Sequence, residues 1–171
     1  MKIISPQNLN DHIPLLSQLL INCVDVDASL GFLPPLTISA AQQYWQAVNN
    51  ELESNDKVIF IALQNAQILG SVQLSLINKE NGQHRAEVEK LMVHKSARGQ
   101  GVAKALMQTL ETLALSKQRS LIVLDTRKGD IASHLYKKLG YVLGGEIPNF
   151  ARNAAGNLES TVYFYKNIFP H

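Results

Sequence analysis

A glycine-containing segment, residues 98–103, joins a stretch typical of a β-strand to a stretch typical of an amphipathic helix. The expected strand covers residues 86–93, and the expected helix runs from residue 101 to about residue 116 with one apolar stripe. A short apolar run at 121–124 follows and is typical of a strand buried on both faces. Strand, helix and strand in this order predict a right-handed crossover between parallel strands, and therefore a sheet covered by helices.

The rest of the chain predicts antiparallel strands and three further helices around that unit. Turns at Asn65-Ala66 and at residues 78–83 separate apolar segments in the way that hairpins do. The expected strands cover 2–5, 58–63, 68–77, 86–93, 121–124, 141–143 and 161–166, and the remaining helices cover 9–23, 131–139 and a segment from Thr37 or Ser39 to Val48. We predict an α/β (α+β) fold: one mixed, mostly antiparallel sheet flanked by helices, in a single domain over residues 1–171.

Composition and charge exclude several classes of protein. The chain is 46% hydrophobic and 18% charged, which does not fit a disordered protein. Its net charge is +2, so nothing indicates nucleic-acid binding. No signal peptide or membrane-spanning run is present, so we expect no membrane association and a cytoplasmic location. The single cysteine, Cys23, excludes a disulfide framework and favours a reducing compartment.

The small net charge hides an uneven distribution of charge along the chain. Residues 1–84 carry a net charge of −4, residues 85–104 carry +3 and residues 105–171 carry +3. The positive segment 85–104 contains the glycine segment, so we expect it to receive an anionic ligand. The acidic first half contains a loop at 25–37 that is suited to a cationic partner.

The glycine segment has the features of an anion-binding helix start. The first N–H groups of a helix are unpaired and carry partial positive charge, and glycines let an anion approach that backbone closely. Arg98 adds a guanidinium that suits phosphate. An ordinary strand-to-helix turn explains the glycines equally well. The spacing does not fit a P-loop or a dinucleotide fingerprint, whose third glycine is replaced here by Lys104.

The residues around this segment resemble the GNAT superfamily of N-acetyltransferases. The likeness rests on Arg98, Gly101 and Ala103 after the strand 86–93, and on Ala132-x-x-Leu135-Tyr136-x-x-x-Gly140-Tyr141. Within the superfamily, the stretches DASLGF, RAEVEKLMV and ARGQG look most like the tabtoxin-resistance type of acetyltransferase. The resemblance covers nearly the whole chain, and it implies a GNAT-like fold with one parallel strand–helix–strand unit that binds acetyl-CoA.

The resemblance implies where acetyl-CoA, as co-substrate, would lie. Its pyrophosphate would bind backbone amides from Arg98 to Ala103, and its pantetheine arm would pair with the backbone of Leu91 to Val93 in an opening of the sheet. The cofactor-binding residues are thus expected to be Leu91, Met92, Val93, Arg98, Gly99, Gln100, Gly101, Val102 and Ala103. One position departs from the family, because Gly129 stands where many members carry a cofactor-contacting asparagine. Members often form dimers, so a homodimer is among the expected assemblies.

Three acidic residues are candidates for the removal of a proton from an amine. Glu87 and Glu89 lie two apart in a strand and so share one face, whereas Val88 and Met92 are expected on the other. A solvated strand face explains the pair equally well. Asp125 ends the apolar run 121–124, at the side of a sheet where ligands usually bind; it also suits a simple loop cap.

The resemblance assigns roles to these candidates. Glu87 matches the position of the general base in several family members and is favoured over Glu89. Asp125 would be a second acidic residue that acts on the amine. Tyr136 matches the tyrosine that protonates the departing thiolate, although it also fits a core position beside Leu135 and Leu139.

The loop at 25–37 is a candidate contact for the acceptor. Asp25 or Asp27 suits a cationic group and Phe32 suits an apolar one, with Glu89 as a further substrate contact. Cys23 is expected in the core rather than as a nucleophile. The five histidines have no metal-ligand spacing, so we expect no metal site.

The favoured function is transfer of an acetyl group from acetyl-CoA to the primary amine of a small molecule by direct attack on the thioester. An antibiotic or toxin is one such acceptor. Two alternatives stay open: a regulatory module that binds CoA without transferring an acyl group, and an interaction domain without any cofactor. Fold alone does not decide between them.

Overall fold

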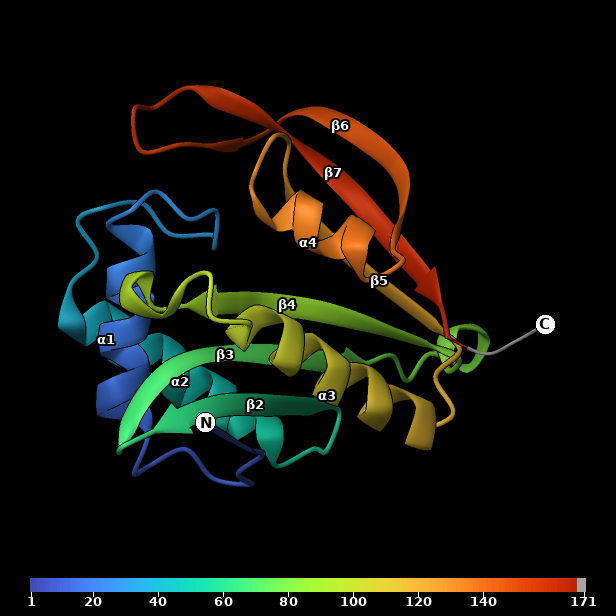
Figure 1. Ribbon diagram of the computed structural model, residues 1–171, viewed down its shortest axis with the longest axis horizontal. Coiled ribbons are helices and arrows are strands. Elements are labelled where there is room, and N and C mark those ends of the chain that lie inside the picture. The colour runs from blue at the N-terminus through green and yellow to red at the C-terminus, as the bar shows by residue number, and fades with distance from the viewer. Residues whose placement is uncertain (169–171) are drawn as a thin grey trace.

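The computed structural model describes residues 1–168, which form one seven-stranded sheet with helices packed on both faces (Figure 1). The strands are β1 (Lys2–Ile4), β2 (Lys57–Gln64), β3 (Gln67–Leu76), β4 (Arg85–Val93), β5 (Leu121–Arg127), β6 (Val142–Arg152) and β7 (Leu158–Asn167). The α-helices are α1 (Ile13–Val24), α2 (Ile38–Leu52), α3 (Val102–Ser116) and α4 (Ala132–Lys138). This element order is the one that the sequence predicts.

The strands lie in the order β1-β2-β3-β4-β5-β7-β6. Every neighbouring pair is antiparallel except β4 and β5, which run parallel and are joined through α3. The predicted mixed, mostly antiparallel sheet with one parallel strand–helix–strand unit is therefore confirmed.

Two apolar cores, one on each face, hold the sheet between its helices. On one face, α3 packs Leu106 and Leu110 against sheet residues such as Val72. On the other, α1 and α2 pack Leu20 and Trp45 against Ile59 and its neighbours. The apolar stripe of each helix decides which side it covers, because only that stripe gains from leaving water.

The first helix starts later than its apolar spacing predicts. It begins at Ile13 with Pro14 in its first turn, a position that suits proline because the missing N–H has no helical partner there. Leu9 lies before the helix, yet it is fully buried, and its N–H donates to Asn49 Oδ1 at 2.6 Å. The second helix is capped by Thr37, whose hydroxyl accepts from the Ala40 N–H at 3.2 Å, as predicted.

The last two strands are longer than predicted. The expected strands at 141–143 and 161–166 are parts of β6 and β7, which continue as one long hairpin to Arg152 and back from Leu158. Every residue of β6 is exposed, so this edge strand has no buried face and no alternation of apolar and polar residues to reveal it. Gly144, Gly145 and Pro148 weaken the strand signal further, and an edge strand tolerates them.

The fifth strand is covered less evenly than its apolar run suggests. Ile122 and Leu124 are buried, whereas Leu121 and Val123 are only half-buried. The prediction of burial on both faces was wrong because α1 and α2 contact mainly β2, β3 and β4.

The fourth strand contains a bulge that changes which side chains share a face. Lys90 adopts φ +52°, and between the pairs Gln73–Glu89 and Ser71–Met92 the strand β4 has one residue more than β3. Met92 consequently packs in the same core as α1 and α2, on the face of Glu87 and Glu89. The expectation that Met92 points the other way was wrong, since a bulge resets the two-residue alternation.

The sheet opens next to this bulge. β4 and β5 pair only from Arg85 with Leu121 to Glu87 with Val123, and beyond that point they diverge (Figure 1). The hairpin of β6 and β7 extends along the far side of the opening, and its tip lies near the loop between α1 and α2.

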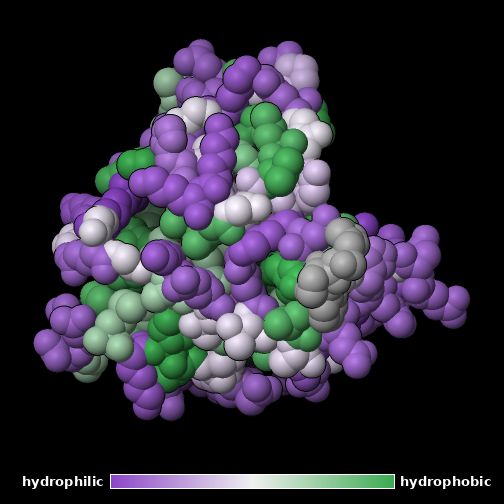
Figure 2. Space-filling view, turned by 45° about the vertical axis from the view of Figure 1, so that its right-hand side comes forward, coloured by the Kyte–Doolittle hydropathy of each residue, from purple (hydrophilic) through white to green (hydrophobic). Residues whose placement is uncertain are grey.

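The visible surface is mostly hydrophilic. On the face drawn in Figure 2, hydrophobic residues form separate patches between polar ones rather than one continuous area. Within residues 1–168, no helix is long and apolar enough to cross a membrane.

Candidate functional site

A groove of about 540 Å³ begins at the N-terminus of α3 and follows the end of β4 into the opening of the sheet. We call it the α3 groove. Eight of the nine predicted cofactor residues line it: Leu91, Met92, Val93, Arg98, Gly99, Gly101, Val102 and Ala103. Gln100 is the exception, since its side chain turns back and donates to the Ser96 carbonyl at 2.9 Å.

The start of α3 leaves backbone amides free to receive an anion. Gly99 and Gly101 have φ +76° and +80°, a conformation that favours glycine, and no atom lies within 4 Å of the position a Cβ would take at either residue. The glycines are thus needed for backbone shape, and the space beside them stays open to a ligand. Free N–H groups, the positive end of the helix and Arg98 together suit a phosphate-bearing ligand.

Cys23 forms part of the inner wall of the α3 groove. It is buried, as predicted, and its thiol lies 3.6 Å from the Val93 carbonyl oxygen. Burial raises the pKa of the Cys23 thiol, and the nearby Arg98 charge offsets only part of this effect. The thiol is therefore protonated at neutral pH, which suits packing better than nucleophilic attack.

A second cavity of about 270 Å³ occupies the opening between β4 and β5. We call it the split pocket. It joins residues of four segments: Glu89 and Lys90 of β4, Asp125 and Arg127 of β5, the loop before α2, and the β6–β7 hairpin. Arg127 and Leu30 line both this pocket and the α3 groove, so the two cavities adjoin.

Asp125 projects into the split pocket. β5 continues two residues past the apolar run, so Asp125 lies within the strand rather than at its end. Its Oδ2 accepts a hydrogen bond from the Thr161 hydroxyl of β7 at 2.7 Å. The residue is exposed and forms no ion pair within residues 1–168, which leaves the carboxylate available to a ligand.

The two glutamates of β4 have different surroundings. Glu89 lines the split pocket, where its carboxylate accepts from the Ser75 hydroxyl at 2.6 Å and pairs with Lys57 at 3.2 Å. Glu87 lines neither the split pocket nor the α3 groove; its Oε1 lies 3.6 Å from Arg85 Nε and the side chain is 44% exposed. The structure therefore brings Glu89 and Asp125 together in one cavity and leaves Glu87 outside it.

Tyr136 lies in the α4 half of the apolar core. Its ring packs against Tyr141 and Phe164, with centroids 5.8 Å and 5.9 Å away. Burial, together with the charges of Asp130 and Asp125, raises the pKa of the Tyr136 phenol well above its usual value. The phenol thus keeps its proton at all physiological pH values and is able to donate a hydrogen bond or a proton. Tyr136 itself lines neither the split pocket nor the α3 groove.

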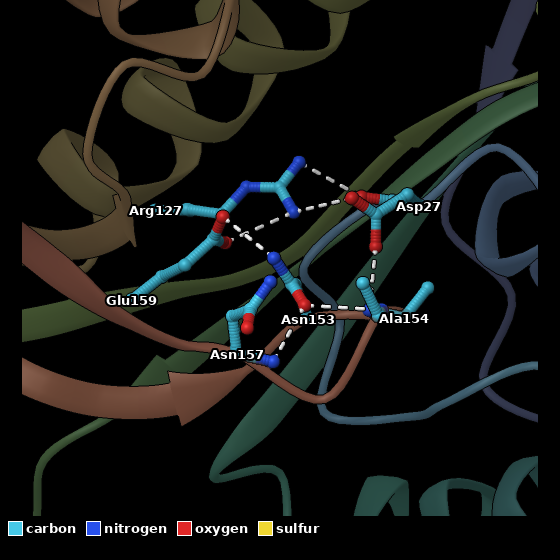
Figure 3. Close-up of polar contacts among 7 residues, drawn as sticks. Asp27, Arg127, Asn153, Ala154, Asn157 and Glu159 are labelled. Atoms are coloured by element: carbon cyan, nitrogen blue, oxygen red, sulfur yellow. Dashed lines mark hydrogen bonds and ion pairs between the residues drawn. The ribbon is translucent and has the colours of Figure 1, made fainter.

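The hairpin tip and the loop before α2 are joined by one ion-pair cluster (Figure 3). Arg127 donates to Asp27 Oδ2 at 2.8 Å and to the Asp27 carbonyl at 2.9 Å, and it also pairs with Glu159 at 3.3 Å. The Ala154 N–H of the hairpin tip donates to Asp27 Oδ1 at 3.1 Å. We call this cluster the Asp27 latch. It joins two segments far apart in sequence, and two of its members, Arg127 and Glu159, line the split pocket.

The latch changes the expected role of Asp27. The hydrogen bond from Arg127, and then that from the Ala154 amide, lowers the pKa of the Asp27 carboxyl. Its charge is already neutralised within the protein, although the residue does line the α3 groove. Asp25 is exposed at the C-terminal cap of α1 and lines none of the cavities found within residues 1–168.

Phe32 belongs to a neighbouring hollow rather than to the split pocket. This loop pocket, of about 200 Å³, adjoins the split pocket through Gly31, Arg127 and Arg152. The Phe32 ring contacts Tyr44 edge-on at 5.2 Å, and Lys90 Nζ lies 5.9 Å from its centroid.

Several pocket residues are absent from the sequence-based prediction. Lys90 gave no local signal because an isolated charge in a strand usually faces solvent. Arg127 follows Asp125 by two residues and so shares its face of the strand, which would have been a usable clue. Thr161 and Glu159 carry no such signal, because only the pairing of β7 with β5 brings them to the pocket. Gly129, in the turn after β5, has φ +82° and open space at its Cβ position, so it offers the groove no side chain.

An open β4–β5 junction beside an anion-binding helix start defines a protein that binds a long, phosphate-bearing ligand and brings its far end into a polar pocket. The sequence model of the Acetyltransferase (GNAT) family matches residues 29–141, more than half of the chain. The chain belongs to this family and is an N-acetyltransferase that uses acetyl-CoA.

Relatives with known activities or structures are distant in sequence. A streptothricin acetyltransferase from Escherichia coli is 26% identical over 120 residues, which cover 69% of this chain and 67% of the relative. An N-acetyltransferase from Staphylococcus aureus Mu50 has a TM-score of 0.81 at 18% identity, covering 99% of this chain and 100% of that structure. The yncA acetyltransferase from Salmonella typhimurium, solved with its cofactor acetyl-CoA, has a TM-score of 0.79 at 13% identity. The match covers 100% of this chain and 96% of that structure. At such identities the solved structures establish the fold alone.

Proposed function

We propose that this protein transfers the acetyl group of acetyl-CoA to the primary amine of a small molecule. The observation that carries the proposal is the continuity of the two cavities. The α3 groove suits the phosphates and the pantetheine arm, and it adjoins a small polar pocket with a free carboxylate, Asp125. The pocket volume of about 270 Å³ fits a small acceptor better than a folded protein segment.

The residues of the α3 groove fit acetyl-CoA. The backbone from Arg98 to Ala103 would hold the pyrophosphate, with Arg98 adding a charge-assisted hydrogen bond. The backbone of Leu91 to Val93 has no strand partner on the β5 side, because β4 and β5 stop pairing at Glu87. Those free backbone groups would pair with the amides of the pantetheine arm. Bound acetyl-CoA supplies the activated acetyl group as a thioester.

The carboxylates would make the acceptor nucleophilic. An amine with a pKa near 10 is mostly protonated at neutral pH, so a base must take one proton before the nitrogen can attack. Asp125 lines the pocket directly, whereas Glu87, which lies outside it, would act through a water molecule. As the new C–N bond forms and the C–S bond breaks, the nitrogen would lose a second proton to solvent. The Tyr136 phenol would give its proton to the thiolate and regain one from solvent.

Substitution of each carboxylate tests these roles. We expect Asp125→Asn and Glu87→Gln to keep their affinity for acetyl-CoA and to lose about 100-fold in kcat, the usual contribution of a general base. Glu80→Gln, at an exposed glutamate outside both cavities, is the matched control. A variant that binds acetyl-CoA normally and turns over at the wild-type rate removes that residue as a base.

The broader proposal is tested by following CoA thiol release against amino acids, dipeptides, polyamines and aminoglycosides. Release with at least one amine, together with an acetylated product of the expected mass, supports it. Binding of acetyl-CoA with no release across the panel would instead favour a CoA-binding regulatory module.

Three finer assignments complete the proposal. A toxin or antibiotic as acceptor follows from the resemblance to the tabtoxin-resistance type, and the Escherichia coli relative is a streptothricin acetyltransferase. Cytoplasmic location agrees with a single, unpaired cysteine. A homodimer stays a prediction, which sedimentation analysis can test.

A further inference from the structure

The split pocket contains six ionic side chains, and three of them have ionic partners. Glu89 is paired with Lys57 and accepts from Ser75. Arg127 is paired with Asp27 and Glu159, whose other carboxylate oxygen accepts from Asn153 at 2.9 Å. These groups have satisfied partners inside the protein, so a ligand gains little by contacting them.

Three ionic side chains of the pocket have no charged partner within residues 1–168. They are Asp125, Lys90 and Arg152. The available charge in the pocket is therefore one negative and two positive groups. An acceptor with several positive charges would meet a single free carboxylate and two cations, and like charges in a partly buried site repel strongly.

Lys90 is the most distinctive of the three. The bulge in β4 turns its side chain toward the loop before α2, where Nζ donates to the Leu30 carbonyl at 2.7 Å. An ammonium has three N–H donors, so two remain for another acceptor. Burial lowers the pKa of Lys90, which shows that its charge has lost hydration that the protein does not fully replace.

Lys90 and Asp125 lie on opposite sides of the opening between β4 and β5. The charge of Asp125 acts on Lys90 in the direction that raises its pKa, yet the two side chains are too far apart to form an ion pair. A molecule with an amine at one end and an anionic oxygen group at the other would contact both residues at once.

We propose that the acceptor is a small amino compound that also carries a carboxylate, with its amine at Asp125 and its carboxylate at Lys90. Arg152, whose Nη1 donates to the Gly156 carbonyl at 3.0 Å, adds a second positive charge at the outer edge. This inference rests on the proposed acetyl transfer and narrows its acceptor to zwitterions such as amino acids or short peptides. Polyamines and aminoglycosides are disfavoured.

Matched acceptor pairs test the carboxylate directly. L-Lysine against L-lysinamide, and alanyl-alanine against its C-terminal amide, differ only in the group that Lys90 would contact. We expect kcat/KM to be at least about tenfold higher for each acid than for its amide, as for one charge-assisted hydrogen bond. In Lys90→Met the ratio of kcat/KM for the acid to kcat/KM for the amide should fall to about one, whereas Lys90→Arg should retain part of the preference.

Lys128→Met is the control, since Lys128 is an exposed lysine that pairs with Glu146 and lines neither cavity. It should keep the full preference for the acid. Circular dichroism and acetyl-CoA affinity establish that Lys90→Met is folded.

The inference is overturned if wild-type protein acetylates the amide as well as the acid, if spermidine is the best acceptor, or if Lys90→Met weakens both members of a pair equally. Calorimetry can compare the binding of the acid with that of the amide in the presence of CoA, without any turnover. It therefore tests the contact of Lys90 with the carboxylate separately from the proposed acetyl transfer. Acid-selective binding without any CoA release would refute the proposed transfer while supporting the assignment of Lys90. CoA release without selectivity for the acid would support the proposed transfer and refute the assignment of Lys90.

Discussion

Asp27 and Arg127, one hundred residues apart, form a two-point contact in which the guanidinium binds both the side chain and the backbone of the aspartate. This contact ties the loop before α2 to β5, and the same carboxylate also holds the tip of the β6–β7 hairpin. The contact between these segments therefore depends on the ionisation of one carboxyl group.

The Asp27 latch should respond to acid. Because its folded-state pKa lies below the usual value of 3.8, Asp27 stabilises the fold fully above that value and loses this effect as pH falls through the lowered pKa. The side chain is 47% exposed, so Asp27→Asn should cost no more than about 1 kcal/mol at pH 7. Urea unfolding measures the difference, which should shrink below pH 3. An equal difference at both pH values would contradict this.

Gly101 should be sensitive to substitution for a backbone reason alone. Its φ of +80° at the cap of α3 is unfavourable for alanine, while the space around its Cβ position is open. Gly101→Ala should therefore cost about 1–2 kcal/mol of stability and weaken acetyl-CoA binding by distorting the amides. Gly145→Ala, at an exposed glycine of ordinary φ with equally open space, is the control and should be nearly neutral. Equal effects at the two positions would count against the argument.

Arg98 should contribute a salt-dependent part of acetyl-CoA affinity. Loss of a charged hydrogen bond predicts a tenfold or greater rise in the Kd of acetyl-CoA for Arg98→Ala. Binding by the wild type should also weaken with added salt more steeply than binding by the variant. Lys117→Ala, at the opposite end of α3, should change neither quantity. Calorimetry at two salt concentrations decides the matter, and salt-independent wild-type affinity would contradict it.

Tyr136 should affect turnover more than stability. Tyr136→Phe keeps the ring packing with Tyr141 and Phe164 and removes only the proton donor, so kcat should fall about 100-fold with little change in Tm. Because its pKa is raised above 10.0, Tyr136 should contribute no alkaline limb to the pH–rate profile below that pH.

Tyr141→Phe is the matched control for this prediction. Tyr141 is also buried in the aromatic cluster and its pKa is also raised, and neither tyrosine lines the split pocket or the α3 groove. The two phenols differ in their charged neighbours, because Tyr136 is influenced by Asp130 and by Asp125 of the split pocket, whereas Tyr141 is influenced by Glu111. Similar losses of kcat in both variants would indicate a structural effect.

The parts of the fold that were predicted well are those that local patterns control. The α3 stripe, the glycine turn before it and the Thr37 cap each depend on residues within one or two turns of chain. The β6 strand was largely missed because it lies at an exposed edge, where no burial imposes alternation. The orientation of Met92 was wrong because a bulge at Lys90 cannot be read from a two-residue alternation.

The candidate site also has one part that local sequence predicts and another that only the tertiary structure forms. The predicted cofactor residues of the α3 groove come from one continuous segment, Leu91 to Ala103, so they could be named from the sequence. The split pocket is assembled from β4, β5, β6, β7 and the loop before α2, and its members become neighbours only when β7 pairs between β5 and β6.

The sequence by itself determined the parallel strand–helix–strand unit and its anion-binding turn, because short-range sterics and helix chemistry are sufficient for both. It also showed a positive window around Arg98. Only the tertiary structure decided which charges remain available to a ligand. Asp27, expected to meet an amine, is neutralised by Arg127, while Lys90 and Asp125 have no ionic partner within residues 1–168. The physical reason is that an ion pair depends on distance in space, and the fold sets that distance independently of separation along the chain.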